Sequence, residues 1–113
     1  MIFGTKLSLR AYVLAALAAS TPLSAEDVAE VSIQNSAFEP ADVNVKSGTR
    51  VLFHNKDQVP HSIVGETGGR EIFRSPDQVG EEETYAVVLS NIGEVNYYCG
   101  VHPGMKGKIS VSK

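Results

Sequence analysis

The sequence has a single cysteine and only three histidines among its 113 residues. One cysteine excludes a disulfide within the chain. Basic residues are also scarce, ten against thirteen acidic ones, so no basic patch is available to bind nucleic acid or an anionic membrane surface. The chain also lacks an apolar run of the roughly 20 residues that a membrane-spanning helix needs. These absences leave the few cysteine, histidine and methionine side chains as the main candidates for chemistry.

The first 25 residues have the layout of a secretory signal peptide. Lys6 and Arg10 form a basic start, an apolar run covers residues 11–19, and the segment ends on the small residue Ala25. Cleavage after Ser20 is the alternative. An uncleaved membrane anchor is disfavoured because the apolar run is too short to span a bilayer. The sequence thus predicts an exported protein.

Removal of this predicted leader, residues 1–25, leaves one domain, residues 26–113, with eight basic and thirteen acidic residues. A domain this short has a small core, which a bound metal could help to stabilise. Exported small domains often use disulfides, but a single cysteine cannot form one internally. The cysteine is therefore an intermolecular link, an unprotected thiol, a nucleophile or a metal ligand.

The domain reads as short strands of alternating apolar and polar residues, separated by turn residues and without a strong helical pattern. The segment from Gly65 to Glu83 is polar and loop-like, with at most a short strand near Glu71 to Phe73. Seven or eight strands in this length predict an all-β fold, a two-sheet Greek-key β-sandwich. The expected strands are residues 31–35, 43–46, 50–55, 62–65, 71–73, 83–90, 94–98 and 106–113.

The cysteine lies in the stretch YYCGVHPGM, where Cys99, His102 and Met105 follow one another at intervals of three residues. Glycine and proline between them predict a tight loop between two strands, which can turn all three side chains toward one point. A second segment should supply a further ligand. His61 begins a strand directly after a proline, whereas His54 has the strand parity of an outward-facing residue.

His61, Cys99, His102 and an axial Met105 have the composition of a blue-copper electron-transfer site. Thiolate and thioether ligands favour Cu(I), and imidazole accepts Cu(II), so one copper ion can cycle between both states. Zinc is the alternative metal, but it usually has a closed tetrahedral ligand set or an open water position, and a methionine suits neither. A buried structural thiol is the alternative for the cysteine.

The chain resembles the cupredoxins, the small type 1 blue-copper proteins, and within them it is most similar to amicyanins, with plastocyanins and pseudoazurins as related groups. The stretches FEPADVNVKSGTRVLFHNKDQVPHS and EVNYYCGVHPGMKGKISV carry the resemblance. The Cys-x2-His-x2-Met spacing matches the short amicyanin loop. The resemblance departs at Ser62, where the family usually has asparagine, and at Gly104, where amicyanins usually have a bulky residue.

Three further features have two interpretations each. Asn55 is either a plain turn residue or a brace for the copper loops. The acidic run Glu81 to Glu83 is either a solvated face, which is the usual role of such runs, or a docking patch. One of Tyr97 and Tyr98 should pack in the core and the other should be half exposed.

The resemblance implies a monomeric electron carrier rather than an enzyme. A copper oxidase or nitrite reductase needs more histidines than the one left after His61 and His102. A periplasmic copper chaperone or scavenger is the alternative function. Expected partners are transient redox proteins, such as a dehydrogenase donor and a c-type cytochrome acceptor. In some relatives the loop histidine leaves the reduced metal at low pH, which predicts a reduction potential that rises as pH falls.

Overall fold

The computed structural model describes residues 27–113, and in this part of the chain it contains strands and no helix. The predicted leader, residues 1–25, lies outside the described residues. Within residues 27–113 there is no helix that could cross a membrane. The strands are β1 Val28–Gln34, β2 Ala37–Glu39, β3 Asp42–Lys46, β4 Arg50–Asn55, β5 Val64–Thr67, β6 Arg70–Arg74, β7 Thr84–Val88, β8 Gly93–Tyr98 and β9 Lys106–Ser112.

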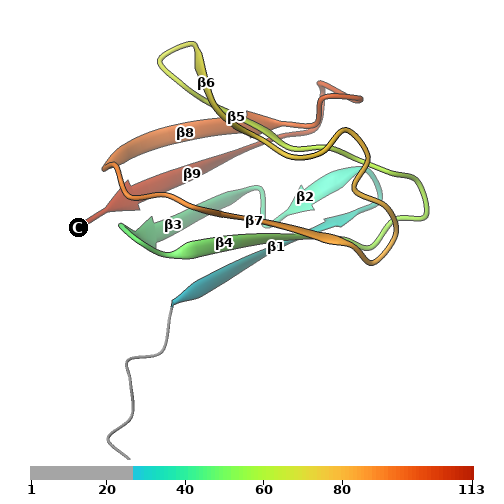
Figure 1. The fold of residues 1–113 in the computed structure, drawn as a ribbon, viewed down its shortest axis with the longest axis horizontal. Helices are drawn as coiled ribbons and strands as arrows, with labels where there is room; N and C mark the ends of the chain where they lie inside the picture. Colours follow the sequence, from blue (N-terminus) through green and yellow to red (C-terminus); the bar gives the residue numbers. More distant parts are fainter. Residues whose placement is uncertain (1–26) are drawn as a thin grey trace, which may run out of the picture.

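The strands form two layers, which confirms the predicted two-sheet sandwich (Figure 1). One sheet has the order β2-β1-β4-β7 and the other has the order β3-β9-β8-β5-β6. Both sheets are mixed, because β1 pairs parallel with β4 and β3 pairs parallel with β9, while the other pairs are antiparallel. Side chains from the inner faces of both sheets interdigitate to form the core.

The alternation in the sequence sets which side chains enter this core. On β4, Val51 and Phe53 are fully buried, and on β9, Ile109 and Val111 are buried while Lys106 is exposed. Tyr97 on β8 is also buried, with Tyr98 half buried, as predicted. The Tyr97 hydroxyl donates a hydrogen bond of 2.7 Å to a backbone carbonyl, so burial of this polar group is compensated.

Two parts of the fold differ from the prediction. The sandwich has nine strands rather than seven or eight, because the three-residue strand β2 is too short to show an alternation. The predicted short strand at 71–73 is present but extends over β6, and with β5 it forms a hairpin within the segment predicted to be loop-like. Gly68 and Gly69 form its turn with φ values of 60° and 77°, as a two-residue hairpin loop requires.

Two loops meet at one end of the sandwich, opposite the C terminus (Figure 1). One follows β4 and contains residues 56–63, and the other joins β8 to β9 and contains residues 99–105. The first crosses from β4 in the four-stranded sheet to β5 in the five-stranded sheet, and the second connects two strands of the five-stranded sheet. Both sheets therefore contribute side chains to this end of the molecule.

Candidate metal centre

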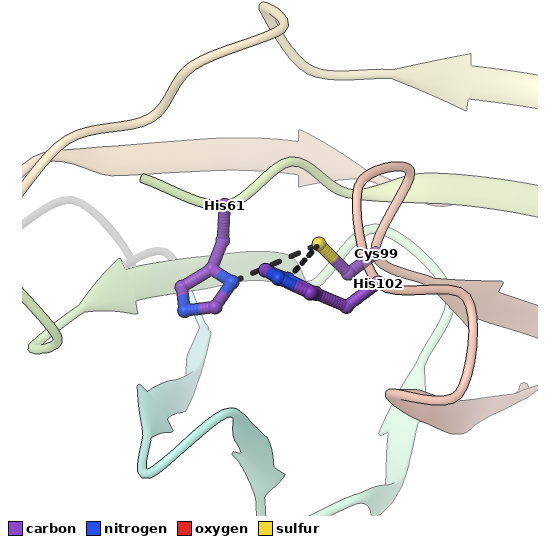
Figure 2. A group of neighbouring side chains, drawn as sticks. All are labelled: His61, Cys99 and His102. Atoms are coloured by element: carbon purple, nitrogen blue, oxygen red, sulfur yellow. Dashed lines mark hydrogen bonds between the residues drawn. The ribbon is translucent and has the colours of Figure 1, made fainter. Parts of the chain in front are cut away.

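Three of the four predicted ligand residues converge at this end of the sandwich. One donor atom each from His61, Cys99 and His102 lies within 4.8 Å of the other two. The Cys99 Sγ atom is 3.7 Å from His61 Nδ1 and 4.0 Å from His102 Nδ1 (Figure 2). A thiol sulfur and two imidazole nitrogens thus point toward one another, from two loops that are 38 residues apart in sequence.

His61 is fully buried and is fixed by the backbone around it. Its own amide and carbonyl exchange hydrogen bonds of 3.1 and 2.8 Å with Val79, an isolated bridge between two loops. Its Nε2 atom lies 2.9 Å from a carboxylate oxygen of Asp57. Because Nε2 faces this carboxylate, Nδ1 faces the sulfur. The prediction that a rigid segment aims this histidine is consistent with these contacts.

The side chain of Asn55 braces the loop that carries His61. Of its two interpretations, this favours a brace over a plain turn residue. Its side chain is fully buried, and Nδ2 donates to the carbonyls of Val59 and Val79 at 3.0 and 2.9 Å. Its Oδ1 atom accepts a hydrogen bond from the amide of Asp57 at 2.9 Å. One side chain therefore satisfies three backbone groups on both sides of the histidine, which is more than a surface turn residue does.

The loop from Cys99 to Met105 is closed by its own backbone. The Cys99 amide donates to the Met105 carbonyl at 3.1 Å, and the Met105 amide donates to the His102 carbonyl at 2.9 Å. Cys99 and Met105 are buried, with 0% and 6% of their surface exposed, whereas His102 is exposed. The loop therefore places methionine beside the buried end of the site, and its role as an axial ligand stays a prediction.

The surroundings of Cys99 favour its thiolate form. Burial alone would raise the pKa of the thiol, but backbone amides of Ser62, His102 and Val101 and the side chain of His61 stabilise the anion and lower the pKa to about 6. The Ser62 amide lies 3.5 Å from the sulfur. Since the thiolate is the form that binds metals, the sulfur is ready to act as a ligand at neutral pH.

Ser62 ties the two loops together despite its small size. Its hydroxyl accepts a hydrogen bond of 2.9 Å from the amide of Gly100, the residue after Cys99. The serine therefore bonds to a backbone group of the other loop, although the family usually has asparagine at this position. Gly100 is packed closely against the hydroxyl, since a Cβ atom there would lie 2.7 Å from Ser62 Oγ. Gly104 is in open space, with no atom within 4 Å of the corresponding position.

His54 lies outside this cluster, as its strand parity predicts. Its ring contacts two carboxylates instead: Nε2 is 2.8 Å from Glu82 and Nδ1 is 3.4 Å from Glu30. Glu83, in the same acidic run, accepts a hydrogen bond of 2.7 Å from the amide of Gly80. Two of the three acids in the run from Glu81 to Glu83 thus have partners within the described chain.

Apolar residues neighbour both histidines in sequence, one pair on each loop. Val101 and Pro103 flank His102, and Val59 and Pro60 precede His61; all four are exposed, the valines at 56% and 50%. We call Val59, Pro60, Val101 and Pro103 the apolar rim. The two histidine rings lie 5.4 Å apart between their centroids, so the two loops that carry the rim residues meet at the site.

Asp57 is the functional residue that sequence reasoning missed. Burial raises its pKa, but hydrogen bonds from the Ser36 amide, from His61 and from the Asn35 amide outweigh this and hold the pKa below its usual value. The available signal was an acid four residues before the histidine predicted to be a ligand. That spacing alone does not show that the loop folds back to bring the two side chains together.

The sequence matches the family described as cupredoxin-like domain over residues 7–111. Amicyanin of Paracoccus denitrificans is 30% identical over 103 residues, which cover 86% of this chain and 78% of that protein. Plastocyanin of Lactuca sativa is 34% identical over 86 residues, which cover 66% and 87%. The structure of a reduced amicyanin variant is similar, with a TM-score of 0.70 and 26% identity over 79% of this chain and 86% of that one.

The donor set of the present chain fits the metal of these relatives. Another amicyanin variant of similar fold is described as a Cu(I) form. A thiolate within reach of two imidazole nitrogens combines a soft ligand with ligands that suit copper in both oxidation states. The sequence match, the nine-stranded sandwich and the cysteine–histidine cluster together show that this chain belongs to the cupredoxin family.

Proposed function

We propose that the protein is a blue-copper electron carrier that transfers one electron at a time between other redox proteins. The observation that carries this proposal is the convergence of Cys99 Sγ with the Nδ1 atoms of His61 and His102, on loops held by both sheets. Copper, when bound, supplies a one-electron Cu(II)/Cu(I) couple. His61, Cys99 and His102 are the proposed ligands, and Met105 is the proposed axial ligand.

The positions of the ligands give each a distinct role. Cys99 lies directly after β8 and contributes the thiolate, which connects the site to the five-stranded sheet. His61 is enclosed and held by Val79 and Asp57, so its ring cannot easily reorient. A site held in this way changes little when an electron arrives or leaves, which is what fast electron transfer requires.

His102 is the proposed entry and exit point for electrons. It is the exposed member of the cluster, and the apolar rim lies on the same two loops. Weak redox encounters use small interfaces that dissociate quickly, and such an apolar surface suits one. By analogy with amicyanin, we propose a dehydrogenase as the donor and a c-type cytochrome as the acceptor, with the carrier acting as a monomer in the periplasm.

The same geometry argues against catalysis by this chain alone and against a role in copper delivery. The remaining histidine, His54, contacts Glu30 and Glu82 rather than a second metal cluster. Copper chaperones favour exposed and exchangeable sites. Here Cys99, His61 and Met105 are all buried, so we propose that copper stays in place while electrons move.

The first test is the visible spectrum of the Cu(II)-loaded protein beside those of two variants. We expect an intense blue band from the thiolate–copper bond, which Cys99→Ser removes. Met105→Ala should retain the band at a shifted position, because an axial ligand tunes the site without creating it. A colourless wild-type protein that binds zinc or only Cu(I) would contradict the electron-carrier function.

A second test separates electron transfer from copper delivery. Mixing oxidised and reduced protein should give fast electron exchange, measured by NMR line broadening, while copper passes slowly to a competing chelator. Slow electron exchange together with rapid loss of copper would identify a copper-handling protein.

A further inference from the structure

Asp57 connects His61 to the turn between β1 and β2, a segment that contains none of the proposed ligand residues. Its Oδ2 atom lies 2.9 Å from His61 Nε2, on the side of the ring away from Cys99. The carboxylate also accepts hydrogen bonds from the amides of Asn35 at 2.8 Å and Ser36 at 2.9 Å, in the turn between β1 and β2. The carboxylate thus accepts from two amides and faces the ring nitrogen of the proposed ligand.

The carboxylate is itself held in one position. Asn35 and Ser36 both have φ values of 55°, which turns their successive amides toward the same two oxygens. The amide of Asp57 donates to Asn55 Oδ1 at 2.9 Å, which fixes the backbone at this residue. The side chain of Asp57 is only 15% exposed. It is therefore a fixed acceptor rather than a mobile surface acid.

This arrangement determines which ring nitrogen of His61 carries the proton. A carboxylate accepts hydrogen bonds, so Nε2 is the protonated nitrogen and donates to Asp57. Nδ1 is then left with its lone pair, on the side that faces the sulfur at 3.7 Å. A metal ligand needs this tautomer, because only an unprotonated nitrogen can bind a metal.

We propose that Asp57 is a positioning residue that fixes the ring orientation and tautomer of His61 and, through its negative charge, favours the oxidised over the reduced copper site. This rests on the proposed function, since it takes His61 as a copper ligand. A carboxylate that accepts from a ligand histidine makes the imidazole a stronger donor. The more highly charged Cu(II) benefits more than Cu(I) from both effects.

The test replaces the carboxylate by an amide of the same shape. In copper-loaded Asp57→Asn, Cu(II) affinity should fall at least tenfold relative to Cu(I) affinity, in line with other partners of metal-bound histidines. A tenfold change corresponds to an upward shift of about 59 mV in the potential of a one-electron couple. The matched control is Asp77→Asn, the same substitution at an exposed loop residue without a contact to His61 in the described chain.

Nitrogen NMR of the metal-free protein tests the positioning role without copper. The His61 ring should be in the Nε2–H tautomer in the wild type and in Asp77→Asn, and should become a mixture of tautomers in Asp57→Ala, which removes the acceptor. Asp57→Glu, which keeps the charge on a longer side chain, should restore part of the wild-type potential. This rescue separates the effect of the charge from a loss of stability in the turn between β1 and β2.

Two results would overturn the proposal: a potential for Asp57→Asn equal to that of Asp77→Asn, or an unchanged His61 tautomer in Asp57→Ala. A fall in thermal stability alone, without either change, would show a purely structural role. If the wild-type protein gave no blue copper site, the proposed function would fail, while the tautomer measurement would still decide whether Asp57 positions His61.

Discussion

The two histidines of the site lie in opposite environments. His61 is fully buried, paired with Val79 through its backbone and with Asp57 through its side chain. His102 is exposed, on a loop closed by hydrogen bonds between Cys99, His102 and Met105. His61 is thus enclosed at the end of the sandwich, whereas His102 lies at the surface. The comparison teaches that one cluster can combine a fixed histidine with an accessible one.

Replacing each histidine by glycine should give the largest contrast. His102→Gly leaves a gap at the surface, and added imidazole should enter it and restore the blue band. His61→Gly leaves a gap that is enclosed by the protein, and added imidazole should restore the band poorly. Titration of both Cu(II)-loaded variants with imidazole, followed by visible spectroscopy, measures the difference. Equal recovery in both variants would show that the two positions are equally accessible.

The ionisation of Cys99 should make the stability of the metal-free protein depend on pH. The pKa of the thiol is lowered from 9.0 to about 6 in the folded protein, so the folded state favours the thiolate. This contribution is fully present above pH 9 and is lost as pH falls through 6. The free energy of unfolding of the wild type, minus that of Cys99→Ser, should therefore increase from pH 6 to pH 9. A difference that is constant over this range would contradict the lowered pKa.

Asn55→Ala should weaken the fixed half of the site. The substitution removes two donated hydrogen bonds and one accepted bond, which takes the side-chain partner from the part-buried Val59 carbonyl and Asp57 amide and one of two donors from the Val79 carbonyl. We expect a loss of about 1–3 kcal/mol in the free energy of unfolding, measured with urea. Asn44→Ala, at an exposed position on β3, is the matched control and should change stability by less than about 0.5 kcal/mol. Equal losses in both variants would show that Asn55 is not a brace.

Substitution by alanine should change stability differently at the two glycines of the loop that contains residues 99–105. At Gly100 a Cβ atom would lie 2.7 Å from Ser62 Oγ, so Gly100→Ala should disturb the link between the two loops and cost about 1 kcal/mol. At Gly104 the space is open, and Gly104→Ala should leave stability and the visible spectrum nearly unchanged. Thermal unfolding of the copper-free variants measures the difference. A larger loss for Gly104→Ala would contradict this description of the loop.

Much of the fold follows from local patterns in the sequence. On β9, Ile109 and Val111 alternate with polar residues, and on β4, Val51 and Phe53 share one face of the strand; all four side chains are buried. Strand β2 was missed because three residues, Ala37–Glu39, are too few to show a period of two. The β5–β6 hairpin was predicted only in part, because most of its side chains are exposed and polar.

The site was partly predictable for a different reason. Cys99, His102 and Met105 lie on one short loop, so their spacing alone indicates a shared target. His61 could be chosen because few histidines compete with it. Asp57 could not be found in this way, since its contact with His61 depends on the path of the loop and on the amides of Asn35 and Ser36 in the turn between β1 and β2, beside the end of β4.

The most direct test of the account is X-ray absorption spectroscopy of the copper site in both oxidation states. The account predicts one sulfur from Cys99 and two imidazole nitrogens from His61 and His102 in the Cu(II) and the Cu(I) protein alike, with only small changes in bond length. Loss of the sulfur or of a histidine on reduction at neutral pH, or a ligand set without the Cys99 thiolate, would contradict a fixed site built for electron transfer.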